Sequence, residues 1–420
     1  MAEILAIIGG GASGLAAAIQ AAILLRQKGS DTSVVILERG QRVGRKLLAT
    51  GNGRCNLSNR QASPDHYHGA DPGFVREAFR RFPVKSNLDF FYKMGLLTVE
   101  EEDGKLYPRP LQASAVLDVL RMEAERLGVE IRCGAEVLSL RRQRGGFLLE
   151  TAEGTLFARA VIVAAGGEAS ASLGGCDSGY RLLSSLGHRI TERRPAIVQL
   201  KTDVTFTKPL AGMKMDGLVT LSGKEPVSRF GEILFTEYGI SGPPVMTLSS
   251  LVTRRLGSGK EVSLTLDLLP DLEEERLRKI LSGRAASHPE RRLEEFFTGL
   301  IPKRLGQCAL KAEGIVPLSR TADSLTPGEL TALCRRLKGW KLTVTGHNGM
   351  KNAQVTAGGA ETAGFFPDTL ESRLAPGLFA CGEVLDIDGD CGGYNLQWAW
   401  SSGRLAGEGA AVRLCRGSGI

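Results

Sequence analysis

The chain begins with a glycine-rich turn between a short apolar segment and a helix-forming one. Residues 6–15 read AIIGGGASGL, so a G-x-G-x-x-G pattern follows directly on an apolar run. In a strand–turn–helix unit, Gly9 allows the tight turn, Gly11 lets the backbone approach a pyrophosphate, and Gly14 lets the helix pack closely on its strand. The N-terminus of such a helix attracts an anion. The pattern predicts a nucleotide-pyrophosphate site at Gly9, Gly11, Ala12, Ser13 and Gly14.

The residues after this turn supply the context that the motif needs. A helix is expected over 13–28, with Gly29 able to cap it, and a second buried parallel strand over 34–37 that ends in Glu38. An acid at this distance binds a ribose hydroxyl, and a carboxylate there repels a 2′-phosphate. The sequence therefore predicts the adenosine of FAD or NAD rather than NADP. The alternative is a glycine-rich turn in some other α/β protein.

Length and composition describe an ordinary globular protein. The 420 residues suggest two or three domains, and 42% are hydrophobic and 24% charged. No apolar stretch is long enough to cross a bilayer and no leader is recognised, so a cytoplasmic protein without membrane insertion is expected. Eight cysteines without C-x-x-C spacing argue for reduced thiols and against zinc. His66 and His68 are interpreted as a loop pair, and no metal is expected.

The net charge of +7 permits a nucleic-acid surface, but its distribution favours a simpler cause. Basic residues occur in short groups mixed with acids and without interleaved aromatic residues, unlike an RNA-binding stripe. An anionic cofactor or substrate is the preferred explanation. No nucleic-acid partner is expected.

A second glycine-rich and basic segment, ERGQRVGRKLLATGNGRCN, spans residues 38–56. Such a composition wraps backbone amides and cations around an extended anionic ligand, although a solvent loop can share it. The sequence GNGRCN, at residues 51–56, is too constrained in its backbone conformation for an ordinary connecting loop, which favours a flavin contact. Cys55 is interpreted as a small packed side chain rather than a redox thiol. The predicted contacts are Glu38, Arg39, Arg45, Lys46, Gly51, Asn52, Gly53, Arg54, Cys55 and Asn56.

The predicted secondary structure changes several times along the chain. A helix over 111–127 and strands over 129–133, 137–140 and 147–151 precede a buried strand over 158–167. This strand ends in small residues, among them Ala165 and Gly166, where a cofactor can pass over the backbone. Residues 196–267 are β-rich and 272–337 are helical, which predicts an inserted β-barrel or sandwich and an inserted helical subdomain. The predicted segments are 1–192, 193–270, 271–342 and 343–420.

The C-terminal part of the chain again contains patterns that are typical of cofactor binding. A strand over 378–381 is followed by Gly382 and Glu383, where the acid can hold ribityl hydroxyls. Gly392 and Gly393 lead into a helix over 395–413 whose first amides can face the N1–C2=O edge of a flavin. Asp386 and Asp390 either lie at this edge or cap a turn or helix. The predicted contacts are Gly382, Glu383, Gly392, Gly393, Tyr394, Asn395 and Leu396.

These blocks together resemble the BaiN-type, or aminoacetone-oxidase-like, family of flavoproteins over nearly the whole chain. The resemblance implies an α/β fold with a Rossmann-like FAD-binding domain formed by both chain ends, and β-barrel-like and helical insertions that cover the flavin. Two departures are Glu237, where the family usually has His, and Ala165, where it commonly has Thr. The motifs that carry the resemblance are residues 9–14, 38–39, 44–46, 51–56, 234–243, 353–359, 382–389 and 391–398.

A bound flavin makes the protein an oxidoreductase, because hydride is exchanged at N5. The resemblance implies reduction of a conjugated C=C bond of a 3-oxo steroid or bile-acid intermediate, as in bile-acid 7-dehydroxylation and steroid and lipid metabolism. NAD(P)H is a possible transient electron donor, since no second dinucleotide fingerprint is present. Tyr238 and Tyr394 are the proposed proton donors, with Glu237 next, against the alternative of buried tyrosines bonded to backbone. An oxygen-dependent amine oxidase and a flavoprotein acting on RNA are the other hypotheses.

Overall fold

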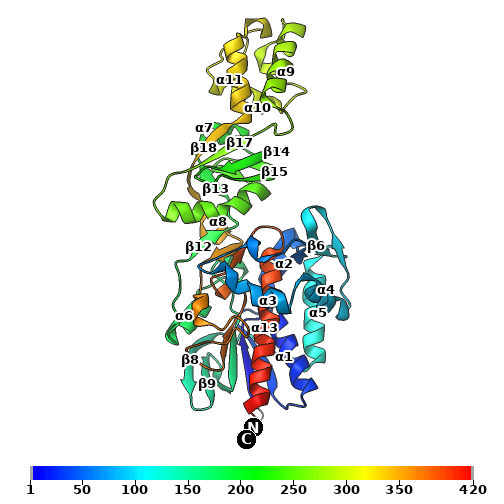
Figure 1. The fold of residues 1–420 in the computed structure, drawn as a ribbon, viewed down its shortest axis with the longest axis vertical. Coiled ribbons are helices and arrows are strands. Elements are labelled where there is room, and N and C mark those ends of the chain that lie inside the picture. The colour runs from blue at the N-terminus through cyan, green and yellow to red at the C-terminus, as the bar shows by residue number, and fades with distance from the viewer. Residues whose placement is uncertain (1–2, 418–420) are drawn as a thin grey trace. The chain divides into compact units, whose positions relative to one another are not determined.

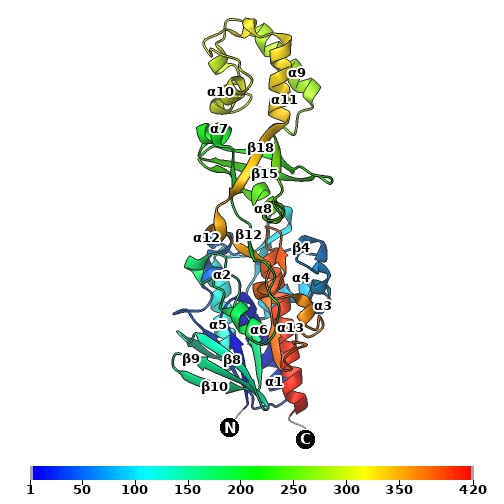
Figure 2. The same cartoon turned by 90° about the vertical axis from the view of Figure 1, so that its left-hand side faces the viewer.

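The computed structural model describes residues 3–417, and these residues form two compact units (Figures 1 and 2). The first, called here the terminal unit, joins the chain up to Pro195 with the chain from Ala353 onward. The second, called the inserted unit, is Ala196–Asn352. Each unit has its own cluster of buried apolar side chains, which is what allows each to be described separately.

The centre of the terminal unit is a parallel five-stranded sheet in the order β20-β11-β1-β2-β7. Its central strands are continuous apolar runs because helices or further sheet cover both faces, so there is no solvent side to require polar residues. The register joins Leu5 to Ala160 and to Val34, which aligns the carboxyl ends of three strands at one edge. The strands are β1 (Ile4–Ile8), β2 (Ser33–Glu38), β7 (Glu130–Cys133), β11 (Ala160–Val163) and β20 (Leu378–Ala380).

Two helices from opposite ends of the chain pack against each other on this sheet. They are α1 (Ala12–Gln27) and α13 (Tyr394–Gly417). A Cβ added to Gly403 or Gly407 would collide with the backbone of α1, so these glycines permit a close approach of the two helix backbones. The predicted C-terminal helix is therefore present and extends further than 395–413. α5 (Ala113–Arg126) also contacts α1.

Smaller elements surround the parallel sheet. An antiparallel sheet of β8 (Val137–Gln143), β9 (Gly146–Thr151) and β10 (Gly154–Ala158) lies between β7 and β11 in the chain. The other strands are β3 (Ser58–Asn59), β4 (Tyr67–His68), β5 (Thr98–Glu100), β6 (Lys105–Pro108), β12 (Arg194–Ala196), β19 (Val355–Ala357) and β21 (Asp388–Gly389). The remaining helices of this unit are α2 (Arg45–Ala49), α3 (Val75–Arg81), α4 (Val84–Lys93) and α6 (Ser178–Ser185).

The inserted unit contains a closed barrel in the order β13-β16-β15-β14-β17-β18. Buried side chains alternate with partly buried ones along β17 and mostly with exposed ones along β18, which marks the inner and outer faces. The boundary predicted at 342 falls inside β18, because this strand pairs with β17 and β13 to close the barrel. The strands are β13 (Leu200–Thr202), β14 (Lys214–Leu221), β15 (Val227–Thr236), β16 (Gly239–Ser241), β17 (Val262–Asp267) and β18 (Trp340–His347).

Helices complete the inserted unit. Residues 243–257, expected to be β-rich, instead form α8 (Pro243–Gly257), because two prolines suit the first turn of a helix, where their missing N–H groups would have no intrahelical partner. The predicted helical segment contains α9 (Glu274–Ser287), α10 (Lys303–Ala312) and α11 (Pro327–Lys338). A capping box between Thr326 and Glu329 starts α11. Two short helices are α7 (Val204–Thr207) and α12 (Gly349–Asn352).

Candidate active site

The glycines in the turn between β1 and α1 have two different roles. Two of them are required by close backbone contacts, and one has open space beside it. Gly9 has φ +107°, and a Cβ there would lie 2.5 Å from the Ala164 carbonyl oxygen. A Cβ on Gly14 would collide with the Gly9 carbonyl, so this glycine brings helix and strand together. A Cβ on Gly11 would meet no described atom within 4 Å. No side chain caps α1 at Gly11, so the helix start has the open space and amide donors that fit a pyrophosphate.

Glu38 at the end of β2 is bound to this turn. Its Oε2 accepts the N–H of Gly10 at 2.8 Å, and its Oε1 accepts the N–H of Gly40 at 2.6 Å. These two bonds use one lone pair on each oxygen, and a carboxylate can accept further donors. Glu38 is therefore fixed beside the glycine turn with capacity left for ribose hydroxyls.

Three basic side chains of the segment 38–56 bind protein groups in the described structure. Arg39 donates to the carbonyl of Gly174 at 3.1 Å, and Arg45 donates to that of Ser172 at 2.9 Å. Lys46 forms an ion pair of 2.7 Å with Glu383. These contacts connect the segment to two other loops of the terminal unit, so one role of the cations is to hold these loops together.

The GNGRCN sequence bends sharply after α2. Gly51 and Asn52 both have left-handed φ of 56°, and residues 51–53 are exposed. Arg54 pairs with Glu101 and lies over the ring of Tyr107 at 4.3 Å. Cys55 is fully buried, and burial raises the pKa of its thiol to about 12. Cys55 is thus a packed thiol, in line with its interpretation from the sequence.

The two segments that follow β11 and β20 also meet near the start of α1. Gly166 has φ +72°, and a Cβ there would meet no described atom within 4 Å. Gly382 has φ +75°, and a Cβ there would lie 2.5 Å from the Ser13 hydroxyl oxygen. Glu383 accepts the N–H of Thr356 at 2.9 Å besides pairing with Lys46. The half-buried Ala165 lies directly before Gly166.

The start of α13 is held by side chains from distant parts of the chain. Gly392 and Gly393 have φ of +122° and +97°, and a Cβ on Gly393 would collide with the Ser58 carbonyl. Asn59 donates to the carbonyl of Gly392 at 3.0 Å, and the Asn395 amide bonds both N–H and C=O of Gly389 at 2.8 Å. The Asn56 amide faces Gly393 as well. The turn, the half-buried Leu396 and the helix dipole are therefore fixed in place.

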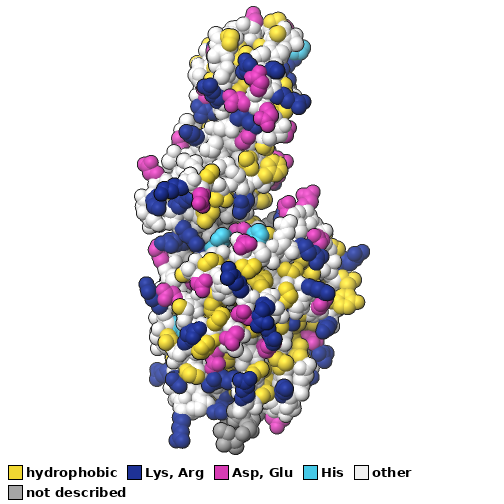
Figure 3. All heavy atoms as spheres, viewed as in Figure 1, with side chains coloured by type: hydrophobic (Ala, Val, Ile, Leu, Met, Phe, Trp, Pro, Cys, Tyr) yellow, Lys and Arg dark blue, Asp and Glu magenta, His cyan; other side chains and the backbone are white. Residues whose placement is uncertain are grey.

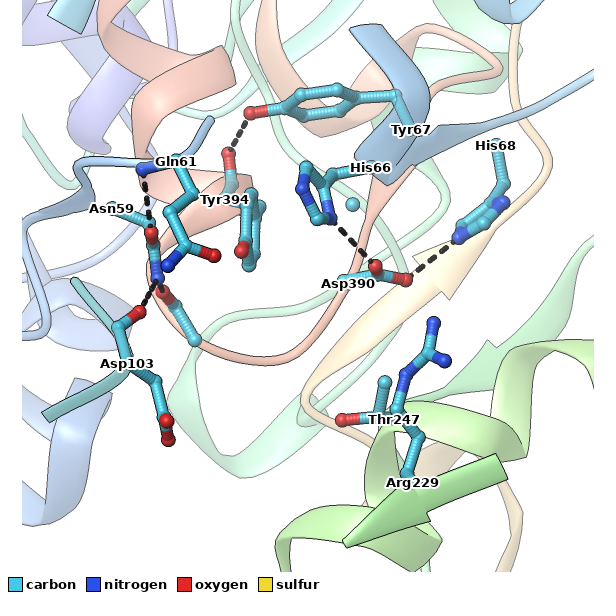
Figure 4. A network of polar contacts seen from close by, with 12 residues as sticks. Asn59, Gln61, His66, Tyr67, His68, Asp103, Arg229, Thr247, Asp390 and Tyr394 are labelled. Atoms are coloured by element: carbon cyan, nitrogen blue, oxygen red, sulfur yellow. Dashed lines mark hydrogen bonds and ion pairs between the residues drawn. The ribbon is translucent and has the colours of Figure 1, made fainter. Parts of the chain in front are cut away.

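A polar network beside this turn was not recognised as functional from the sequence (Figure 4). Asp390 binds His66 Nδ1 at 3.1 Å and His68 Nε2 at 2.8 Å. Burial raises the pKa of Asp390, but hydrogen bonds from His68 and His66 outweigh it, so the pKa lies below its ordinary value. Asp390 therefore binds side chains, whereas Asp386 accepts the N–H of Ala70 at 3.2 Å. The spacing of 324 residues between His66 and Asp390 gives no local signal.

The proposed proton donors lie in both units. Tyr394 is buried, and its ring stacks on that of His66 with centroids 4.4 Å apart. The Tyr67 hydroxyl donates to the Tyr394 carbonyl at 2.8 Å (Figure 4). Glu237 is exposed and Tyr238 is half-buried, in the turn between β15 and β16 of the inserted unit. The Tyr238 carbonyl accepts the N–H of Thr202 at 3.1 Å.

Among the described residues 3–417, no group of three or more His, Cys, Asp or Glu side chains is arranged to hold a metal ion. No helix in the same range is long and apolar enough to span a membrane.

The comparison with protein families gives a match over residues 3–409 to the model described as the HI0933-like protein Rossmann domain. The chain belongs to the HI0933-like family. It is 43% identical to the 3-dehydro-bile acid delta(4,6)-reductase of Clostridium scindens, over 97% of this chain and 98% of the relative. It is also 32% identical to the ribosomal RNA dihydrouridine synthase of Escherichia coli, over 94% and 95% of the two chains.

Solved structures match this chain at low sequence identity. A 3-ketosteroid-delta4-(5alpha)-dehydrogenase from Rhodococcus jostii matches with 17% identity and a TM-score of 0.49, covering 97% of this chain and 96% of that one. The family model and the relatives confirm the BaiN-type resemblance, the α/β Rossmann fold and the class of flavoprotein oxidoreductase. An HI0933-like protein is thus expected to bind FAD, and the space at Gly11 and Gly166 with the fixed Glu38 fits such a ligand.

Proposed function

We propose that this protein is an FAD-dependent reductase that saturates a C=C bond conjugated to a carbonyl, in a 3-oxo steroid or bile-acid intermediate. The observation that carries the proposal is the 43% identity, over nearly the full length of both chains, to a reductase named for this chemistry. The substrate is then a small hydrophobic molecule. This is a reaction on a CH–CH group, as the family resemblance implied.

The residues of the terminal unit fit the demands of that reaction. When bound and reduced, FAD supplies a hydride from N5. Gly9, Gly11 and Gly14 would hold the pyrophosphate and Glu38 the ribose. The start of α13, fixed by Asn59 and Asn395, would present a positive dipole end to the electron-rich ring.

The reaction also needs one proton and a source of electrons. The proton-donor assignments made from the sequence, Tyr394, Tyr238 and Glu237, remain proposals. NAD(P)H is the proposed electron donor. Because the sequence holds one dinucleotide fingerprint, at residues 9–14, the nicotinamide would dock transiently at the flavin rather than in a second Rossmann site.

A second candidate substrate is a uridine base in RNA, and two observations favour it. Relatives from Escherichia coli and Haemophilus influenzae, 32% and 31% identical over 94% of this chain, are ribosomal RNA dihydrouridine synthases. The inserted unit carries 23 Lys or Arg against 17 Asp or Glu, which is +6 of the net charge of +7. On the face drawn in Figure 3, Lys and Arg side chains are interspersed with Asp and Glu. The uracil C5=C6 bond is conjugated to a carbonyl, so the same chemistry reduces it.

An anaerobic reoxidation experiment separates these possibilities. The holoenzyme is reduced with dithionite and mixed with 3-oxo-4-ene steroids or with a uridine-containing ribosomal RNA fragment, and flavin absorbance is followed. Reoxidation by the steroid, with saturated product, is the expected result. Reoxidation by RNA alone would transfer the assignment to the second candidate. If neither compound reoxidises the flavin, oxygen is then admitted and the oxidised enzyme is mixed with a primary amine; reoxidation by oxygen alone and reduction by the amine would make the protein an amine oxidase.

The cofactor assignment has its own measurement. Denaturation of the purified protein is expected to release non-covalent FAD, because the cradle offers pyrophosphate and ribose sites that FMN lacks the groups to use. Release of FMN, or a colourless protein that FAD does not reconstitute, would contradict the proposal.

A further inference from the structure

In one polar arrangement of the terminal unit, a carboxylate is held between two imidazoles. His66 and His68 come from one short segment and Asp390 from the loop before α13 (Figure 4). We propose that these histidines, oriented by Asp390, supply the proton for the reduction, in place of a tyrosine hydroxyl. This inference rests on the proposed function. Asp390 would then be a positioning residue.

The hydrogen bonds fix which nitrogen of each ring carries hydrogen. The pKa of Asp390 is lowered below its ordinary value, so the side chain is an ionised acceptor at neutral pH. His66 must therefore donate from Nδ1 and His68 from Nε2. The opposite nitrogens, Nε2 of His66 and Nδ1 of His68, are left to gain and lose the transferable proton. Imidazole is the side chain best suited to this exchange near neutral pH.

The backbone holds the assembly rigidly. β4 pairs with β21, so His68 lies opposite Asp388, and the N–H of Asp390 donates to the His66 carbonyl at 3.0 Å. The His66 ring stacks on Tyr394, the first residue of α13. The side chains of His66 and His68 are 30% and 22% exposed, which permits both exchange with water and access by a substrate.

Other ionisable groups surround the pair and enter its pH dependence. Tyr67 on β4 is buried, and burial raises its pKa well above the ordinary value. Cys391 follows Asp390, and burial raises its pKa to about 11. Both therefore stay neutral where imidazole titrates. Further ionisable groups on the neighbouring elements are Tyr394 at the start of α13, Asp388 in β21, Asp386 two residues before it, and Lys105 at the start of β6.

One protonated histidine supplies the single proton that the chemical step needs. Addition of hydride to the β-carbon leaves the electron pair of the C=C bond on the α-carbon and carbonyl oxygen of the substrate. An imidazolium N–H bond then breaks as the α-carbon–hydrogen bond forms, which leaves a neutral imidazole and the saturated ketone. Water afterwards returns a proton to the imidazole. General acids of this kind typically contribute about 10²-fold or more.

Nuclear magnetic resonance tests the arrangement without any substrate. The chain has five histidines, so ¹⁵N-histidine labelling of the FAD-bound protein gives a small set of ring signals. His66→Gln and His68→Gln assign two of them. We expect His66 to carry hydrogen on Nδ1 and His68 on Nε2 in the neutral state, and Asp390→Asn to change both patterns. Unaltered tautomers in Asp390→Asn would overturn the positioning role.

Kinetic measurements test whether the two histidines donate the proton. Flavin reoxidation by the steroid enone, in single turnover, is measured from pH 5.5 to 9 for the wild type, His66→Gln, His68→Gln and the double variant. The wild-type rate is expected to fall as imidazole loses its proton. The double variant should lose about 10²-fold at neutral pH and show a flat profile, with FAD retained. The double variant His66→Phe with His68→Gln keeps an aromatic ring over Tyr394 and is expected to lose the rate nonetheless, and His288→Gln on the exposed surface is the matched control.

The other possible outcomes distinguish a failure of this inference from a failure of the proposed function. A wild-type rate and profile in the double variant would overturn the inference while leaving the reductase proposal intact. A loss of about 10²-fold in Tyr394→Phe or Tyr238→Phe, with the histidine variants unaltered, would return the donor to a tyrosine. Failure of the wild type to reduce any conjugated carbonyl compound would remove the proposed function and, with it, this inference.

Discussion

The two units obtain their polar interactions in different ways. In the terminal unit, pairs such as Lys46–Glu383 and His66–Asp390 join residues more than 300 positions apart. In the inserted unit, Arg278–Glu275 and Lys214–Glu232 lie on one helix or one hairpin, and pairs between elements, such as Lys338–Asp267, join residues less than 100 positions apart. A site that must hold a cofactor from several sides requires groups converging from distant segments, whereas local pairs support individual elements. The ion pairs between distant residues and the proposed cofactor site lie in the terminal unit, and most of the net charge lies in the inserted one.

The largest expected effect concerns the contact between α1 and α13. Gly407→Ala should destabilise the protein by about 2–3 kcal/mol, because a Cβ would collide with the Ala17 backbone, which moves only with the whole helix. Urea unfolding followed by circular dichroism measures this. Gly283→Ala on the exposed face of α9 is the matched control, since a Cβ there meets no described atom within 4 Å. It should stabilise by roughly 0.5–1 kcal/mol, and equal effects at the two glycines would contradict this comparison.

The next prediction distinguishes a glycine that leaves space for the cofactor from a glycine that allows close packing of the backbone. Gly11→Val should weaken FAD binding at least about tenfold, or ~1.4 kcal/mol, while the folded protein persists, because its side chain would occupy space that only the ligand fills. Titration of the apoprotein with FAD gives the affinity. Gly14→Ala, whose Cβ would collide with Gly9, should instead lower stability. FAD binding by Gly11→Val at wild-type affinity would remove this glycine from the cradle.

A third prediction compares the tyrosines of the two units. If either hydroxyl is the acid, Tyr394→Phe or Tyr238→Phe lowers the rate of flavin reoxidation by an enone about 10²-fold without loosening FAD. Stopped-flow measurement of prereduced protein distinguishes them. A change confined to Tyr238→Phe would show that the inserted unit supplies chemistry as well as charge. With neither changed, Glu237→Gln tests the third residue proposed from the sequence.

The smallest effect is the pH dependence of stability from two histidines. Burial lowers the pKa of His188 in the terminal unit, and burial followed by the charge of Lys201 lowers that of His347 in the inserted unit. The unfolded chain then binds the proton more readily, so stability is lost as pH falls below about 6.5. His188→Gln should flatten the acid side of a urea-unfolding series. Added salt should reduce the His347 effect more, since the Lys201 charge is screened.

The strand, turn and helix of the proposed cofactor cradle were predictable because they depend on residues close together in the chain. The strand, the glycines 9–14, the helix and Glu38 lie within about 35 residues, and each has one physical task that few residue types perform. The helix start after Gly393 was predictable for the same reason. The packed, neutral Cys55 also followed from the absence of a partner cysteine nearby.

What the sequence by itself determined is therefore the class of protein: an α/β flavoprotein with inserted β-rich and helical parts. The tertiary structure decided which distant residues meet. It turned residues 243–257 into a helix, closed the barrel with β18, and brought His66 and His68 to Asp390. Such pairings leave no periodic or local signal, because a hydrogen bond across 324 residues depends on every element that folds between its partners.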